Sequence, residues 1–227
     1  MKNIMIVSAT KHSSLDMDKI LINESNLIYE DYSGDIECNI EFNNTEALSK
    51  VYNKFIINDL KDYIVVFVHD DCIIEDMALI QKLRASMMEF DVVGLAGIKE
   101  PITIKEPALW HLMGDRSQYS GAVAHFTGND DVERFMTSFG VTPARVILLD
   151  GVFLAVNVEK CLEKNVRFDK TNPARFHYYD VDFSLTANKA GLKLGTWPIW
   201  VTHKSHGLTK PDEEFYKGQE WFIKKWT

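Results

Sequence analysis

At residues 63–71 the chain reads Tyr63-Ile64-Val65-Val66-Phe67-Val68-His69-Asp70-Asp71, and this stretch decides the fold. The first six residues form a continuous apolar run without alternation, which is typical of a strand covered on both faces in a parallel sheet. The run stops abruptly at three adjacent ionisable residues. We therefore expect a central, parallel strand whose carboxyl end carries polar chemistry.

The segments before this strand predict further strands and helices. Residues 4–7 predict a short first strand that ends at Ser8-Ala9-Thr10. We expect a helix through Leu15, Ile20 and Leu21, followed by extended pieces at 27–29 and 36–42. The apolar spacing over 47–56 predicts a helix, and residues 43–46 supply its capping chemistry.

The segments after this strand repeat the alternation. They predict a helix over 77–88 and a strand over 91–98, as in a sheet with helical crossovers. An apolar run at 146–156 is interrupted by Asp150-Gly151. A helix at 180–190 closed by Gly191, a strand at 194–201 and an amphipathic tail at 215–226 complete the pattern.

One long segment breaks the periodicity. Prolines and glycines punctuate residues 99–145, which we expect to be irregular and mobile. We see no linker that divides the chain, so the expectation is one domain over residues 1–227.

Composition excludes several classes of protein. The 227 residues are 46% hydrophobic and 26% charged, with a formal charge of −8, which opposes a broad basic face for nucleic acid or anionic lipid. No run of about 18 apolar residues predicts a membrane-spanning helix. The N-terminus is unlike a secretory signal, and Cys38, Cys72 and Cys161 have no metal-finger spacing. These features predict free thiols and a cytoplasmic location.

The first polar motif is His69-Asp70-Asp71 at the end of the central strand. Ligands bind beyond the carboxyl ends of strands in open α/β sheets, and carboxylates there can hold Mg²⁺ or Mn²⁺ against a diphosphate. The alternative is a solvated turn in which Asp71 caps the following helix.

The second motif runs from Phe176 to Leu185 and places Asp180 and Asp182 at the start of a helix. Together with His177, these acids would form the wall of a polar pocket in which one carboxylate acts as a general base. Ordinary capping of the helix explains one acid equally well.

The third motif is Thr202-His203-Lys204-Ser205-His206-Gly207, directly after a predicted strand. An imidazole here would ligate a metal and Lys204 would face a phosphate, whereas a lone histidine is more often structural. Asp150-Gly151 is either a bulge or a substrate contact. Trp110 either stacks on a sugar or anchors its loop.

In their order and spacing, these motifs resemble the small glycosyltransferase-family-2-like proteins with the GT-A fold, over nearly the whole chain. The resemblance implies a three-layer α/β/α domain with a mixed, mainly parallel central sheet. It places the donor site over the central strand ends. It also implies Mn²⁺ or Mg²⁺, a nucleotide-diphospho-sugar donor with UDP favoured, and a glycan or other hydroxyl acceptor.

The resemblance carries roles onto individual residues of this chain. It implies that Asp180 is the catalytic base. The metal ligands are Asp71, with Asp70 or His69, and His203. The donor contacts are Ser8, Ala9, Thr10, Asp70 and Lys204. The residues facing the sugar or acceptor are Trp110, Asp150, Gly151, His177 and Asp182.

The resulting expectation is a metal-dependent, inverting glycosyltransferase of the hexosyltransferase type. Two departures from the family pattern keep a second reading open: His69 stands where Asp-x-Asp has its first acid, and Tyr179 stands where a Glu is common. That reading is a catalytically inactive GT-A-like module that binds a nucleotide or glycan. A nucleotidyltransferase or phosphohydrolase using the same acids is the third.

Overall fold

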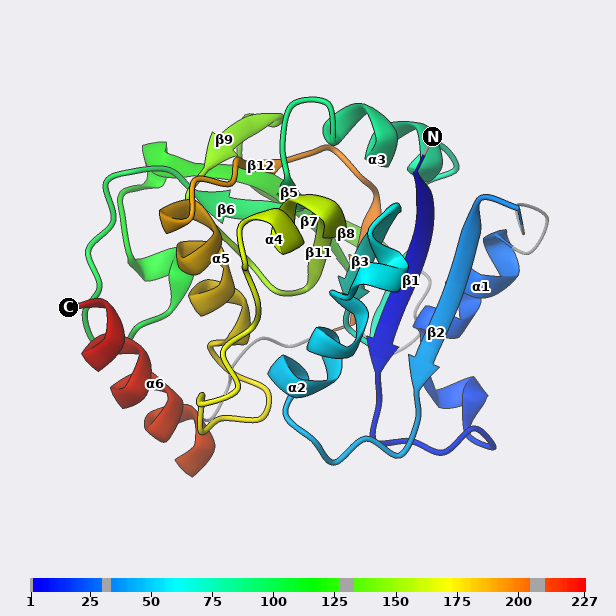
Figure 1. Cartoon of the computed structure of the whole chain (residues 1–227), viewed down its shortest axis with the longest axis horizontal. Coiled ribbons are helices and arrows are strands. Elements are labelled where there is room, and N and C mark those ends of the chain that lie inside the picture. The colour runs from blue at the N-terminus through cyan, green and yellow to red at the C-terminus, as the bar shows by residue number, and fades with distance from the viewer. Residues whose placement is uncertain (1, 30–33, 127–132, 205–210) are drawn as a thin grey trace.

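The main sheet of the computed structural model, which describes residues 2–29, 34–126, 133–204 and 211–227, has seven strands (Figure 1). Their order is β2 (Ile36–Glu41), β1 (Asn3–Ala9), β3 (Tyr63–Val68), β11 (Phe153–Asn157), β5 (Val92–Gly94), β12 (Leu194–Thr196) and β9 (Ala144–Val146). Strands β2, β1, β3, β5 and β12 run in one direction, whereas β11 and β9 oppose them. The predicted mixed, mainly parallel sheet is confirmed.

Strand β3 lies inside the sheet, as its apolar run predicts. It pairs parallel with β1 and antiparallel with β11, so the prediction of a parallel strand holds on one side only. Its residues from Ile64 to Val68 are buried on both faces. Because β1 and β3 are parallel, their carboxyl ends meet at one edge of the sheet, where Ala9 and His69 follow.

Helices cover both faces of this sheet and make three layers (Figure 1). On one face, Ile64, Val66 and Val68 share a core with α1 (Ile22–Tyr29) and α3 (Leu79–Ser86). On the other face, Val65 and Phe67 pack with α2 (Leu48–Tyr52), α4 (Val158–Glu163) and α5 (Tyr179–Lys189). The C-terminal α6 (Glu213–Trp226) packs outside, against the exposed side of α5.

A smaller sheet stands beside the main one. Its order is β10 (Leu148–Leu149), β6 (Ala96–Ile98), β7 (Tyr119–Phe126), β13 (Val201–His203) and β4 (Cys72–Ile74), with β8 (Arg134–Gly140) paired to β7. The single strands predicted over 91–98 and 194–201 are each two strands, one in each sheet. The chain turns between them at Leu95, whose carbonyl accepts from Ala122 N at 3.0 Å, and at Pro198, which has no N–H to donate.

The N-terminal predictions need two corrections. A 3-10 turn at Met17–Lys19 replaces the helix expected through Leu15 and Leu21. Residues 27–29, expected to be extended, belong to α1. The helix is stabilised by tertiary contact: Tyr29 is buried and its hydroxyl donates to the Asp76 carbonyl at 2.6 Å.

The segment expected to be irregular over 99–145 is so only in its first part. Residues 99–118 carry two 3-10 turns, Trp110–Leu112 and Arg116–Gln118, and no strand. Beyond them β7 and β8 pair as an antiparallel hairpin. The small residues of β7, such as Ser120, Gly121 and Ala122, give no hydrophobic alternation, so the sequence pattern missed this strand.

Two remaining 3-10 turns, Asn53–Phe55 and Asn58–Leu60, connect α2 to β3. Within the described residues, no helix is both long and apolar enough to cross a membrane. Cys38 is exposed, Cys72 and Cys161 are buried, and none of the three forms a disulfide within the described residues.

Candidate active site

A cavity of about 410 Å³ lies where the ends of β3 and β13 face the start of α5. His69 and His203 enter from these strand ends, Asp150 and Gly151 from the turn before β11, and Asp180 from α5. The cavity therefore collects residues from all three motifs.

Three side chains at one side of the cavity form a cluster of metal-ligand types. One ligand atom each from His69, Asp71 and His203 lies within 4.8 Å of the others. The Asp71 Oδ1 is 3.2 Å from His203 Nε2 and 4.0 Å from His69 Nδ1. Strand pairing places His203 beside Asp71. Strand β13 pairs with β4 in the register His203↔Cys72, and Lys204 N donates to the Asp71 carbonyl at 2.9 Å.

The cluster fits a divalent cation. The Asp71 Oδ1 is shielded from solvent, and none of the residues that the structure describes forms a hydrogen bond with it. A buried carboxylate oxygen in this state needs a partner, and imidazole nitrogens with a carboxylate oxygen are common ligands of divalent metals. His69, not Asp70, accompanies Asp71 in this cluster.

The Nε2 atom of His69 contacts Tyr179, which is itself hydrogen-bonded to Gly151. The His69 Nε2 is 2.8 Å from the Tyr179 hydroxyl, which donates to the Gly151 carbonyl at 3.0 Å. Burial lowers the pKa of His69, with a smaller contribution from the charge of His203. His69 is therefore neutral near pH 7.

Asp180 is a partly buried carboxylate that lines the cavity and has a raised pKa. Its Oδ2 accepts from Gly151 N at 2.8 Å. Burial first, and then the charge of Asp150, raise the pKa of Asp180 to about 7. A carboxylate with a pKa near the working pH is suited to general base catalysis.

Gly151 permits this arrangement because it has no side chain. A Cβ at position 151 would lie 2.5 Å from the Tyr179 hydroxyl and 2.7 Å from the Asp180 Cβ. Of the bulge and the substrate contact expected at Asp150-Gly151, the structure shows no bulge: the pair lies in the turn between β10 and β11 and lines the first cavity.

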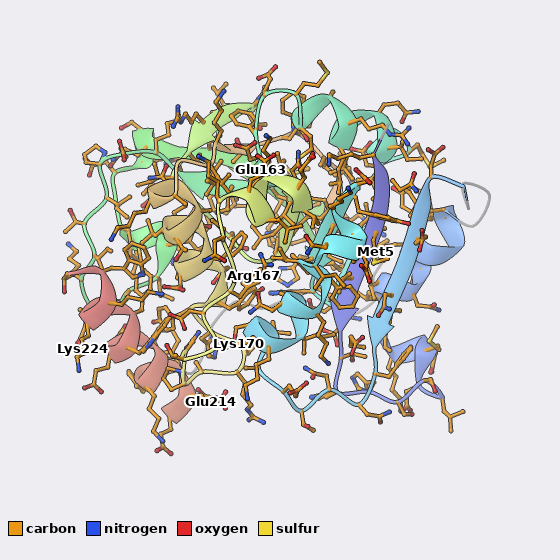
Figure 2. All side chains as sticks on the ribbon, viewed as in Figure 1. Met5, Glu163, Arg167, Lys170, Glu214 and Lys224 are labelled. Atoms are coloured by element: carbon orange, nitrogen blue, oxygen red, sulfur yellow. The ribbon has the colours of Figure 1, made fainter. Side chains whose placement is uncertain are left out.

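A second cavity, of about 300 Å³, adjoins the end of β1 and the start of α2. Ala9 and Asp70 line it together with the cations Lys11 and Arg175. Arg175 is ion-paired with Glu214, which Figure 2 labels at one end of α6. Phe176 lines both cavities and is the wall between them.

A family model described as "Glycosyltransferase like family" matches residues 29–226. The chain belongs to this glycosyltransferase-like family. Its three layers and mixed sheet are the GT-A-like architecture that the motifs implied. No curated protein matches the sequence significantly.

Two solved structures are among those similar to this glycosyltransferase-like chain. The crystal structure of A197 from STIV has 14% identity and a TM-score of 0.48, over 93% of this chain and 98% of that one. The structure of HddC from Yersinia pseudotuberculosis has 9% identity and a TM-score of 0.39, over 98% of this chain and 100% of that one. At these TM-scores neither likeness bears on the assignment.

The structure brings most of the predicted sugar and acceptor residues of this glycosyltransferase-like chain together. Trp110, Asp150, Gly151 and His177 all line the first cavity. Asp182 does not: it is 1% exposed and bonds to Lys225 and to Trp226 Nε1 at 2.8 Å. Two residues along a helix turn a side chain about 200° away, so Asp180 and Asp182 face different neighbours.

The predicted donor contacts are distributed differently from the expectation. Ser8 and Thr10 are buried, and the Thr10 hydroxyl accepts from His12 N at 3.2 Å, which leaves Ala9 to line the second cavity. Lys204 is exposed and lines neither of the two cavities described. Ser205, His206 and Gly207 of the third motif lie outside the described residues.

Sequence reasoning missed several residues of the two cavities. His125 and Phe139 come from β7 and β8, in the segment without periodicity, so no local pattern marks them. Lys11 and Arg175 had a usable signal, since each directly adjoins a motif already singled out.

Proposed function

We propose that this chain is a metal-dependent glycosyltransferase that transfers a sugar from a nucleotide-diphospho-sugar, with UDP favoured, to a hydroxyl acceptor with inversion. One observation carries the proposal: His69 and His203, which cluster with Asp71, line one cavity together with Asp180, whose pKa is raised to about 7. Membership of the glycosyltransferase-like family supports it. We also propose that residues 1–227 act as one domain.

The second cavity is the proposed nucleotide end of the donor site. Lys11 and Arg175 offer positive charge to a diphosphate, while the backbone near Ala9 borders the nucleoside. Phe176 separates this cavity from the first, so the sugar would lie beyond it, among Trp110, Asp150 and His177.

His69, Asp71 and His203 would hold the divalent ion, Mn²⁺ or Mg²⁺. When bound, such an ion supplies positive charge that stabilises the leaving diphosphate. The need for that charge follows from the chain itself, because Asp70, Asp71, Asp150 and Asp180 line or border the two cavities and would repel a diphosphate.

Asp180 performs the proposed proton transfer. Its carboxylate removes the proton of the acceptor hydroxyl as that oxygen attacks the anomeric carbon from the face opposite the diphosphate. The new C–O bond forms as the bond to the diphosphate oxygen breaks, and the electron pair leaves with the diphosphate. Configuration at the carbon is inverted.

Substitution of the base tests this function. A positioned base contributes about 10²–10⁴-fold, so Asp180→Asn should lower kcat by that factor and largely spare donor affinity. Release of nucleoside diphosphate from a sugar donor, with and without Mn²⁺, is the assay. Asp59→Asn, in the turn before β3, is the matched control and should behave as wild type.

Other outcomes identify the other candidate functions. Normal transfer by Asp180→Asn would show that the base is a different residue. Metal-dependent nucleotide binding without turnover would indicate a binding module, and release of pyrophosphate would indicate a nucleotidyltransferase.

A further inference from the structure

The hydrogen bonds around Tyr179 determine which nitrogen of His69 faces the cluster. A carbonyl oxygen only accepts hydrogen bonds, so the Tyr179 hydroxyl donates its one proton to Gly151 O, 3.0 Å away. The hydroxyl oxygen is also 2.8 Å from His69 Nε2, and that contact is a hydrogen bond only if Nε2 carries the proton. In neutral His69 the other nitrogen, Nδ1, then has a free lone pair.

That lone pair faces an acceptor rather than a donor. His69 Nδ1 is 4.0 Å from Asp71 Oδ1, and a carboxylate oxygen has no proton to give. The same oxygen is 3.2 Å from His203 Nε2 and forms no hydrogen bond within the described residues. Three atoms of metal-ligand types thus lie within 4.8 Å of one another, which suits a cation.

The surroundings keep His69 in this orientation. Tyr179 is 3% exposed and packs edge-on against Tyr52, with ring centroids 5.6 Å apart. The ring of Phe176 lies 5.1 Å from His69 on another side. Such hydrogen-bonded partners fix the tautomer and ring direction of metal-ligating histidines.

The chemistry of the ligands then selects the ion. Mg²⁺ prefers oxygen ligands and keeps several waters, whereas imidazole nitrogens suit divalent transition metals such as Fe²⁺, Ni²⁺ and Zn²⁺. We propose that Tyr179 holds His69 in the tautomer that presents Nδ1 to Asp71 and His203, which makes a two-imidazole, one-carboxylate site selective for a divalent transition-metal ion over Mg²⁺. Tyr179 is a positioning residue here, and the inference rests on the metal role in the proposed function.

A titration of the metal-free protein with Co²⁺, followed by its visible absorbance and without nucleotide, tests the proposal. Tyr179→Phe should weaken Co²⁺ binding by about 10–100-fold, the usual cost of losing such a partner. The matched control is Tyr178→Phe, whose hydroxyl is 3.5 Å from Gln219 Oε1 and away from His69, and it should bind as wild type. Excess Mg²⁺ should not displace Co²⁺ from the wild type.

A second measurement needs no variant and decides the matter if Tyr179→Phe does not fold. Long-range ¹H–¹⁵N spectra of the metal-free wild type should show His69 protonated at Nε2, with the Nδ1 signal shifting on addition of Zn²⁺. A proton on Nδ1, unchanged Co²⁺ affinity in a folded Tyr179→Phe, ready displacement by Mg²⁺, or no Co²⁺ binding would overturn the proposal. Since no sugar donor is used, failed sugar transfer with these results intact would count against the proposed function alone.

Discussion

At the scale of single residues, the backbone of Gly151 forms hydrogen bonds with both Asp180 and Tyr179. Its N–H donates to Asp180 and its carbonyl accepts from Tyr179. Gly151→Ala inserts a methyl group 2.5 Å from the Tyr179 hydroxyl and 2.7 Å from the Asp180 Cβ, so both must move. We expect a loss of about 1–3 kcal/mol in the free energy of unfolding, together with weaker sugar transfer.

Urea denaturation and the diphosphate-release assay would measure these two effects of Gly151→Ala. Gly34→Ala is the matched control, because a Cβ at position 34 meets no atom within 4 Å. Equal behaviour of the two variants would contradict the tight approach at residue 151.

Asp180 also makes stability depend on pH. Its pKa is about 7 in the folded protein against an ordinary value of 3.8, so between these values the folded state keeps a proton that the unfolded chain has lost. Stability from this group is therefore present at low pH and is lost as pH rises toward about 7. In metal-free buffer, the urea midpoint of wild type should fall over this range relative to that of Asp180→Asn. Parallel curves for the two proteins would refute the raised pKa.

At the level of residues, the sequence pointed to side chains that the structure brings together where chemistry and chain position coincide. The polar ends of β3 and β13 hold His69, Asp71 and His203, and the pairing of β13 with β4 brings these residues of two sheets together. Whether His69 or Asp70 accompanies Asp71 depends on the directions of their side chains. Successive side chains of a strand point to opposite faces, so neighbours in the sequence differ in direction. His125 was out of reach, because only the non-local pairing of β7 with β13 brings it to the cavity.

At the scale of elements, Asp182 joins α5 to α6. Its carboxylate is 1% exposed and bonds to Lys225 and Trp226, near the end of the chain. Asp182→Asn removes a charge from a buried hydrogen-bonded pair, and we expect a loss of about 1–3 kcal/mol in stability. Donor affinity should stay unchanged, because Asp182 lines neither of the two cavities described.

Chemical denaturation and donor titration check this role of Asp182. Asp169→Asn is the matched control: it pairs with the same Lys225 but its side chain is 28% exposed, so it should cost less. Weakened donor binding in a stable Asp182→Asn would restore Asp182 to the sugar or acceptor site.

Elements with a clear hydrophobic periodicity were predictable from the sequence. Segments in which the chain passes from one sheet to the other were not. The helix at α5, closed by Gly191 at φ 86°, follows its sequence signals closely. The segments 91–98 and 194–201 each read as one apolar strand, since nothing local records that their two halves pair with different partners. Sheet membership is set by contacts distant in sequence.

At the scale of the whole molecule, the proposed function requires a chain of net charge −8 to take up an anionic donor. Among the described residues, the cations Lys11 and Arg175 in one cavity and the metal-ligand cluster beside the other can offset this repulsion. A nucleotide-sugar at about 100 times its dissociation constant should stabilise the native state by about 2.7 kcal/mol. We expect this thermal shift with Mn²⁺ present and a much smaller one without it.

A thermal-shift panel of nucleoside diphosphates and nucleotide-sugars measures this effect. The same panel on Asp71→Asn is the control, because loss of a cluster carboxylate should remove the dependence on metal. Absence of any response in wild type would reject nucleotide binding altogether.

The chain passes between the two sheets several times, and two of these crossings leave from neighbouring strands. Strands β5 and β12 are hydrogen-bonded neighbours, and each continues within a few residues into the smaller sheet, as β6 and β13. Movement of one sheet away from the other would therefore disturb both of these connections. In hydrogen-exchange experiments, the amides of β5, β6, β12 and β13 should therefore open in a single cooperative event, and the His203 side of the cavity should be protected as strongly as the core of the main sheet.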